Sequence, residues 1–190
     1  MLEENRYYIE GIRNQNQQVI RQFFDTYYPI LYRFIRVQYF NEEDVADILQ
    51  EVFYKAFTRI EQFRRDASIK TWLLSIARNE IRQFLRKQQN WDRKVEKATW
   101  DAESKQELAV ATEDIVLLRV QEKELIEAIQ LLDEKKRQVV ILRLLEECSI
   151  KETAMILDLT ISDVKVSYHR GLQEIRKQLL EQHMKGVEAQ

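Results

Sequence analysis

The scarcity of turn-forming residues limits what this chain can fold into more than any other feature. Three glycines and one proline, Pro29, occur among 190 residues, whereas helix-favouring Leu, Ile, Glu, Lys, Gln and Arg dominate. No segment shows a strong strand alternation. With 45% hydrophobic and 33% charged residues, the composition suits a folded, soluble chain rather than a disordered one. The sequence therefore predicts an all-α protein.

Composition also argues against several functional classes. The single cysteine, Cys148, cannot form an internal disulfide, and His169 and His183 are the only histidines, so no metal-ligand cluster is expected. We find no glycine-rich phosphate loop and no nucleophile–base pairing, so neither an enzyme nor a cofactor is expected. The charged amino terminus and the lack of a long apolar run indicate neither a signal peptide nor a membrane span, which fits a reducing cytoplasm.

Apolar spacing predicts two small helical domains joined by a linker. The first domain is expected over 1–88, with helices at 14–39, broken near Pro29, 42–61 and 69–88. The apolar stripe disappears over 89–114, which predicts a flexible linker. The second domain is expected over 115–190, with helices at 115–131, 134–147, 149–157 and 161–181 that have Asp133, Ser149 and Thr160 as N-caps.

Charge is segregated along the chain although the formal net charge is only −2. Residues 42–61 contain six acidic and two basic residues, whereas 64–97 contain ten basic and four acidic ones. Residues 101–134 are acidic again, with ten acidic and three basic residues. This alternation suggests separate surfaces for separate partners, and ordinary solvated helix faces remain the alternative.

The acidic segment 42–61 predicts an amphipathic helix with a docking face. Its apolar residues recur at steps of three and four, and on the other side Asp47, Gln50 and Glu51 form a polar stripe that could meet arginines. The sequence does not require a partner for the carboxylates of Glu42, Glu43 and Asp44, because carboxylates stabilise a helix when they lie at its amino terminus.

The basic helix predicted at 69–88 suits a phosphate backbone. Lys70, Arg78, Arg82 and Arg86 project from one side, and Asn79 could read a base edge. The preceding loop, 62–70, carries Phe63 and the adjacent Arg64 and Arg65, which suit an unstacked single strand. Trp72 could stack on a base, but its place in the apolar stripe favours a core role.

Segment 149–177 has the pattern of a helix-turn-helix. Ser149 with Glu152 and Thr160 with Asp163 have capping-box spacing or a near variant, and the turn falls near Asp158. A recognition helix would then present outward side chains to the DNA major groove. These are Ser162, Lys165, Val166, His169 and Arg170. A helical hairpin that only packs on the rest of the protein is the alternative.

Four segments together resemble a bacterial extracytoplasmic-function, or group IV, RNA polymerase sigma factor. They are ADILQEVFYKAF (46–57), TWLLSIARN (71–79), LLDEKKRQVVILR (131–143) and VKVSYHRGL (164–172), and they follow the family's order. The resemblance implies two helical domains, called domain two and domain four, joined by a flexible linker that threads toward the polymerase active centre.

The resemblance also implies a partner for each surface. Asp47, Gln50 and Glu51 would contact the clamp helices of core RNA polymerase. The minus-ten element would be recognised and melted by the loop at 62–70, with Arg64, Arg65, Lys70, Arg78, Asn79, Arg82 and Arg86. The residues that would contact the minus-thirty-five element are Ser162, Lys165, Val166, His169 and Arg170. Control by an anti-sigma factor, often membrane-anchored, and a role in stress response are further family expectations, and no small-molecule substrate is expected.

Some positions depart from the family pattern. Asp158 stands where members commonly carry Gly, and Asp is among the residues that tolerate a left-handed backbone. Ser162-Asp163 replaces a common Gly-Thr, and Ser167 replaces a frequent arginine, whose loss is expected to weaken phosphate binding. A stand-alone helix-turn-helix regulator and a helical adaptor are the rival functions, but the regulator leaves the acidic helix without a role.

Overall fold

The computed structural model describes residues 2–38, 41–63, 67–95 and 123–188. Within these ranges the backbone is helical apart from short connections, and none of these residues forms a strand. The predicted all-α class is therefore confirmed. Arg64 and Arg65 lie outside the described residues, as does most of the predicted linker.

The amino-terminal domain contains four α-helices. They are α1 (Leu2–Arg13), α2 (Gln17–Arg36), α3 (Glu42–Arg59) and α4 (Ile69–Val95), with a 3₁₀ turn, η1 (Ile60–Gln62), after α3. Apolar residues from α2, α3 and α4, including Phe23, Phe34, Val52 and Leu73, are fully buried between the helices. Burial of these stripes is what holds such short helices together.

The predicted break near Pro29 is wrong. Helix α2 begins after Asn16, whose side chain accepts hydrogen bonds from the amides of Gln18 and Val19, and it runs through Pro29 to Arg36. Pro29 removes the amide that would bond the carbonyl of Asp25, but Asp25 is exposed, so water can satisfy that carbonyl. Residues 2–13, which the apolar pattern left unassigned, form α1.

Helix α4 continues beyond its predicted end at 88. It runs to Val95, so the first part of the predicted linker, 89–95, is helical. Polar residues replace the apolar stripe there, but Gln, Lys and Arg are good helix formers and can extend a helix that is already nucleated. The domain boundaries at 88 and 114 stay a prediction.

The carboxy-terminal domain follows the predicted order of helices. Residues 123–130 are helical and precede α6 (Glu134–Val140), a π-turn η2 (Ile141–Leu145), α7 (Ile150–Leu157) and α8 (Ile161–Glu188). All three predicted N-caps are confirmed. The side chains of Asp133, Ser149 and Thr160 accept hydrogen bonds from the amides of Lys136, Glu152 and Asp163, at 2.9, 3.2 and 3.0 Å.

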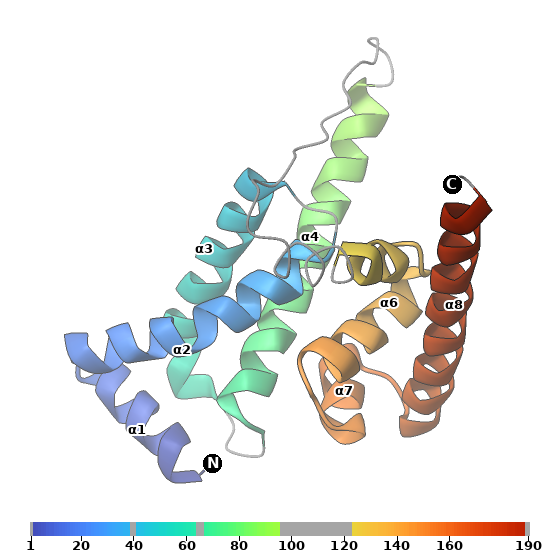
Figure 1. The fold of residues 1–190 in the computed structure, drawn as a ribbon. Coiled ribbons are helices and arrows are strands. Elements are labelled where there is room, and N and C mark those ends of the chain that lie inside the picture. The colour runs from blue at the N-terminus through green and yellow to red at the C-terminus, as the bar shows by residue number, and fades with distance from the viewer. Residues whose placement is uncertain (1, 39–40, 64–66, 96–122, 189–190) are drawn as a thin grey trace, which may run out of the picture.

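The two domains pack against each other along α4 (Figure 1). Helices α1 to α3 lie on one side of α4, and α6 to α8 lie on the other. The direct contacts join α4 to α7 and the end of α2 to η2. The basic helix is therefore also part of the interface between the domains, which the sequence did not indicate.

Candidate functional site

The acidic stripe of α3 is exposed to solvent. Val45, Ile48, Leu49 and Val52 bury one side of the helix, so Asp47, Gln50 and Glu51 are exposed on the other. This is the arrangement that the sequence predicts. The structure thus presents two carboxylates and one amide as a continuous polar face.

The acidic residues in the first turn of α3 have structural partners instead. Glu42 accepts a hydrogen bond from Arg36 at 3.1 Å and pairs with the Tyr32 hydroxyl at the same distance. The amide of Asp44 donates to the side chain of Asn41, which caps the helix. Burial, together with the nearby charges of Asp47 and Glu43, raises the pKa of Asp44. These contacts indicate that the acidic residues of the first turn stabilise the helix start. They therefore differ in role from the exposed stripe of Asp47, Gln50 and Glu51.

Aromatic side chains extend this face in a way that the sequence analysis missed. Tyr54 follows Gln50 and Glu51 at helical spacing and is 64% exposed. On the adjacent α2, Phe24 and Tyr28 are partly exposed, and Phe24 stacks on Phe53 with 4.0 Å between ring centroids. Counting three or four positions on from Gln50 and Glu51 could have identified Tyr54. An exposed tyrosine beside carboxylates is typical of a protein-binding surface.

The predicted basic row on α4 is divided in two. Asn79, Arg82 and Arg86 are exposed, whereas Lys70 and Arg78 are half-buried against the carboxy-terminal domain. Burial first, and then the charge of Arg82, lower the pKa of Arg78. The structure therefore places all five residues on one helix without bringing them together as one accessible surface.

An open groove lies between α4 and the carboxy-terminal domain. It has a volume of about 450 Å³, and Arg78 and Arg82 face acidic residues across it. The residues that line it are Arg78, Arg82, Asp133, Glu134, Lys135, Gln138, Leu157 and Leu159. The mixture of guanidinium and carboxylate groups makes this groove polar and charged on both walls.

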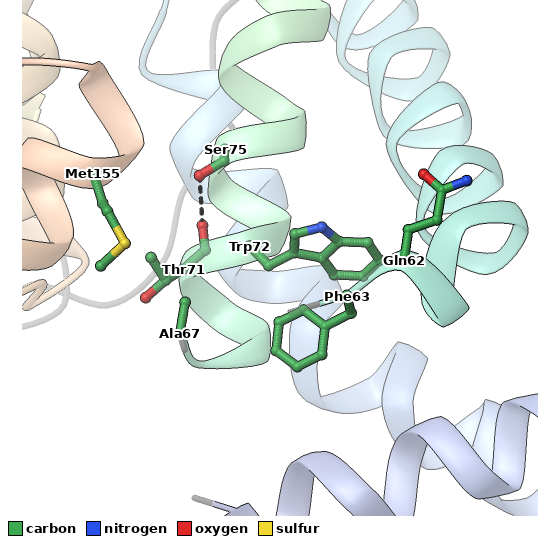
Figure 2. Close-up of a pocket in the computed structure, with 7 residues that line it drawn as sticks. All are labelled: Gln62, Phe63, Ala67, Thr71, Trp72, Ser75 and Met155. Atoms are coloured by element: carbon green, nitrogen blue, oxygen red, sulfur yellow. Dashed lines mark hydrogen bonds between the residues drawn. The ribbon is translucent and has the colours of Figure 1, made fainter. Parts of the chain in front are cut away.

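A second pocket, of about 270 Å³, lies at the start of α4 (Figure 2). Trp72 and Phe63 line it with their rings tilted and 5.2 Å apart, and Met155 contributes from α7. Trp72 is half-buried and packs against the core, as expected, but it is also accessible from this pocket. Both aromatic rings therefore border a space next to the loop at 62–70.

The helix-turn-helix has the predicted local geometry. Ser149 and Glu152 form a reciprocal capping box at the start of α7, and Asp158 ends this helix in the left-handed region with φ of 52°. At the start of α8, hydrogen bonds from Lys135 and then from Thr160 lower the pKa of Asp163 to about 2. These contacts fix the orientation of α8 relative to α6 and α7.

The outward face of α8 contains every residue predicted for groove contact. Ser162, Lys165, Val166, His169 and Arg170 are all exposed. Ser167 is different, because it is only 7% exposed and faces the interior. Ser167 therefore does not lie on the face formed by these five residues, and its expected effect on phosphate binding stays a prediction.

Across 2–38, 41–63, 67–95 and 123–188, no group of three His, Cys, Asp or Glu residues could hold a metal ion. Among the helices in these same ranges, none is both long enough and apolar enough to cross a membrane.

Comparisons with known families agree with the two domains seen here. Residues 23–90 match sigma-70 region 2, which covers most of α2 together with α3 and most of α4. Residues 122–175 match sigma-70 region 4, which covers α6, α7 and the first half of α8. The candidate surfaces on α3, α4 and α8 thus fall within these two regions.

Individual proteins of this kind align over most of the chain. The chain is 30% identical over 164 residues to the ECF RNA polymerase sigma factor SigX of Bacillus subtilis (strain 168), covering 86% of this chain and 84% of SigX. It is 28% identical over 176 residues to SigW of the same organism, covering 90% and 94%. The ECF RNA polymerase sigma-E factor of Escherichia coli (strain K12) is 27% identical over 143 residues, covering 73% and 75%.

Two solved structures share the fold at low sequence identity. CnrH, in complex with the cytosolic domain of CnrY, has a TM-score of 0.67 and 20% identity, covering 93% of this chain and 97% of the other. RpoE of Bartonella quintana, in complex with the anti-sigma factor NepR, has a TM-score of 0.69 and 19% identity, covering 84% and 96%. Because SigX is aligned over most of both chains and the two sigma-70 regions follow in order, this chain belongs to the extracytoplasmic-function (ECF) family of RNA polymerase sigma factors.

Proposed function

We propose that this chain is an alternative sigma factor that binds core RNA polymerase, directs it to specific promoters and helps to melt the DNA there. The observation that carries this function is the presence of sigma-70 regions 2 and 4, in order, in a chain that aligns with SigX over 86% of its length. A stand-alone helix-turn-helix regulator would use α7 and α8 but would leave the acidic face of α3 without a role.

In this proposal, α3 docks on the polymerase. Asp47 and Glu51 are exposed carboxylates one helical turn apart, which suits bidentate pairing with arginines of the partner. Gln50 adds a hydrogen-bonding group, and the exposed Tyr54 adds a large ring at the edge of the same face. Docking would therefore combine charge complementarity with burial of an aromatic side chain.

The minus-ten element would bind along α4 and the preceding loop. Arg82 and Arg86 are exposed and can contact phosphates, and Asn79 beside them can pair with a base edge. Lys70, Arg78 and the two arginines at 64 and 65 complete the proposed set. Holding an unstacked base would offset part of the cost of opening the duplex, roughly a few kcal/mol for each extruded nucleotide.

The minus-thirty-five element would bind the outward face of α8. Lys165, His169 and Arg170 offer phosphate or base contacts, Ser162 offers a hydroxyl at the start of the helix, and Val166 offers an apolar contact. His169 has no role as a catalytic base here. In this proposal the chain is not an enzyme, and catalysis belongs to the polymerase.

The proposed partners place the protein in the cytoplasm, where polymerase and promoter DNA are found. Two structures of similar fold hold a second protein, the cytosolic domain of CnrY in one and the anti-sigma factor NepR in the other. By analogy, we propose an anti-sigma factor for this chain, which could be anchored in a membrane. Its binding would compete with polymerase for the face formed by Asp47, Gln50 and Glu51.

Promoter-directed transcription tests this function directly. Purified core polymerase would be combined with genomic DNA fragments and with wild-type protein or the Asp47→Arg, Glu51→Arg variant. We expect discrete new transcription start sites with the wild type. Transcription from these sites should fall by at least about tenfold with the variant, because each charge reversal places like charges in the docked interface.

A matched control separates the docking face from net charge. Asp25→Arg, Glu181→Arg makes the same charge change at exposed positions on α2 and α8 and should retain transcription. Circular dichroism would verify that each variant is folded. If the wild type produced no new starts and bound DNA without polymerase, the stand-alone regulator would replace this proposal.

A further inference from the structure

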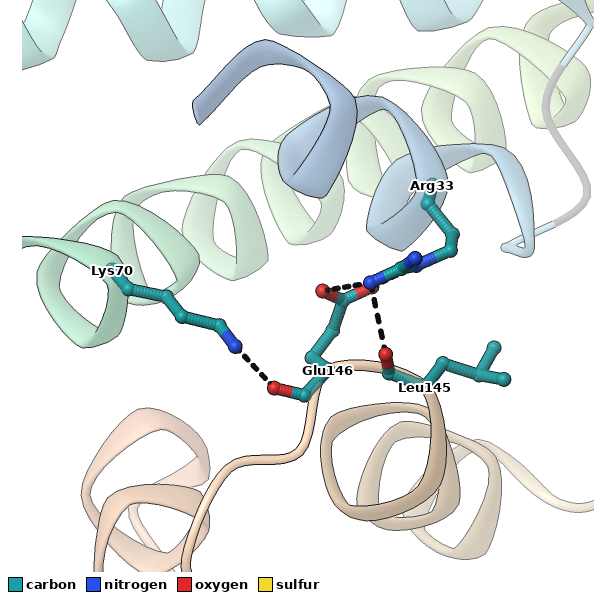
Figure 3. Close-up of polar contacts among 4 residues, drawn as sticks. All are labelled: Arg33, Lys70, Leu145 and Glu146. Carbon is teal, nitrogen blue, oxygen red and sulfur yellow. Dashed lines mark hydrogen bonds and ion pairs between the residues drawn. The ribbon is translucent and has the colours of Figure 1, made fainter. Parts of the chain in front are cut away.

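The interface between the two domains contains a buried ion pair that exists only while the domains are together. Glu146, which follows η2, has a side chain that is 0% exposed. Its two carboxylate oxygens accept hydrogen bonds from Nε and Nη2 of Arg33 on α2, at 2.8 and 2.9 Å. The same Nη2 atom also donates to the carbonyl oxygen of Leu145 at 2.9 Å (Figure 3).

The basic helix supplies the next contacts of this interface. Lys70 donates from Nζ to the backbone carbonyl of Glu146, as Figure 3 shows. Beside it, the Thr71 hydroxyl donates to the Glu152 carboxylate of α7 at 3.1 Å. The amino-terminal end of α4 is therefore hydrogen-bonded to the carboxy-terminal domain at two successive residues.

Acidic residues also face the middle of the basic helix. Arg78 and Arg82 line the groove of about 450 Å³ together with Asp133 and Glu134. The charges of Asp158 and Glu134 raise the pKa of Arg78, although burial and the charge of Arg82 outweigh them and lower it. Carboxylates and carbonyls of the carboxy-terminal domain thus lie where phosphate oxygens of a DNA strand would bind α4.

We infer that the carboxy-terminal domain competes with DNA for the basic face of α4. In the closed state the two domains are in contact, and the Arg33–Glu146 ion pair, which we call the latch, stabilises this state. The inference rests on the proposed minus-ten role of α4. Lys70 and Arg78 are half-buried against the other domain, so a DNA strand would have to displace that domain to reach both side chains fully. Opening would return Glu146 to water, whereas loss of Arg33 in the closed state would leave a buried carboxylate without its ion-pair partner.

The fraction of molecules in the closed state sets how far the apparent affinity of α4 for DNA falls. If the binding-competent open state is a minor fraction of the free protein, the apparent affinity falls by that fraction. A tenfold excess of closed over open molecules therefore weakens binding to α4 by about tenfold. Core polymerase would stabilise the open state if it held the two domains apart.

The test compares Arg33→Glu with wild type in the full chain. Small-angle X-ray scattering measures the radius of gyration, and fluorescence anisotropy measures binding of a labelled oligothymidine at fixed low salt. We expect Arg33→Glu to increase the radius of gyration and to raise the oligonucleotide affinity about tenfold, although the net charge of the variant is lower by two. The charge swap Arg33→Glu, Glu146→Arg should return both values toward those of the wild type.

Arg36→Glu is the matched control. Arg36 lies one turn further along α2 and pairs with Glu42 inside the amino-terminal domain, so its reversal makes the same charge change and leaves the Arg33–Glu146 pair in place. It should leave the radius unchanged and weaken oligonucleotide binding slightly. Thermal unfolding checks that each variant is folded, and Arg33→Gln, which removes the pair without adding a negative charge, replaces Arg33→Glu if that variant unfolds.

Each outcome decides the inference. Equal radii and equal affinities for wild type and the folded Arg33 variants would overturn it. An expanded Arg33 variant with no gain in oligonucleotide affinity would also overturn it, because opening would then expose no DNA-binding surface. Scattering does not depend on polymerase, so an intact latch together with a negative transcription assay would count against the sigma-factor proposal alone.

Discussion

At the scale of single residues, exposure separates the proposed functional side chains from the structural ones. Asp47, Glu51 and Arg170 have the exposure that helical periodicity predicts. Glu146 does not, because nothing in the local sequence shows that a glutamate after an apolar run is fully buried. Its burial depends on Arg33, which is 113 positions away along the chain.

Cys148 gives a prediction at this scale. It is 3% exposed, and burial raises the pKa of its thiol to about 11, with Lys70 acting weakly in the opposite direction. The thiolate is the reactive form, so the native protein should react slowly with Ellman's reagent at pH 8 and rapidly after denaturation in guanidinium. Fast reaction of the native protein would instead favour an oxidation sensor.

The same thiol predicts the direction of a pH effect on stability. The folded state favours the neutral thiol, since its pKa rises from 9.0 to about 11. This contribution to the free energy of unfolding is complete below pH 9 and is lost as pH rises toward 11. Urea unfolding between pH 8 and 11 should therefore show a smaller decline for Cys148→Ala than for wild type.

At the scale of elements, local signals placed the helix starts better than the helix ends. The predicted N-caps Asp133, Ser149 and Thr160 each accept a hydrogen bond from a backbone amide of the helix that follows. Capping depends on residues within one turn, so it can be read from sequence. Helix ends are less certain, and α4 passes its predicted end because polar helix formers carry it onward to Val95.

The packing of α8 on α6 yields a prediction about Gly171. A Cβ atom there would lie 2.7 Å from Cγ2 of Val140, which is fully buried. Valine has little rotamer freedom, so Gly171→Ala should force the helices apart and lower the free energy of unfolding by about 1–3 kcal/mol. Urea unfolding measures this change.

Two further variants test whether the clash with Val140 causes this loss. Gln173→Ala lies two residues further along α8 at an exposed position and should be nearly neutral. Gly171→Ala combined with Val140→Ala should recover part of the loss if the clash is the cause. A Gly171→Ala protein as stable as the wild type would show that the helices can separate without cost.

At the scale of the whole molecule, the contacts between domains should couple their local stability. Arg33, Lys70 and Thr71 bond to the segment that contains Glu146 and Glu152. Hydrogen exchange should therefore be faster by about tenfold in α7 and in the first turns of α4 when Arg33 is changed to Glu, if the contact contributes about 1.4 kcal/mol. Arg36→Glu should leave α7 unchanged, and equal exchange in all three proteins would contradict the coupling.

The sequence by itself determined the helices other than α1, their buried stripes, the helix-turn-helix and the outward residues of α3 and α8, because these depend on spacing and capping within a few turns of one helix. Only the tertiary structure decided which basic residues of α4 are accessible. Lys70 and Arg78 look equivalent to Arg82 and Arg86 along the sequence, yet they are half-buried against the other domain. Arg82 borders the groove to that domain but stays exposed. The physical reason is that burial and ion pairing depend on groups brought together from distant parts of the chain, and periodicity along one helix has no information about them.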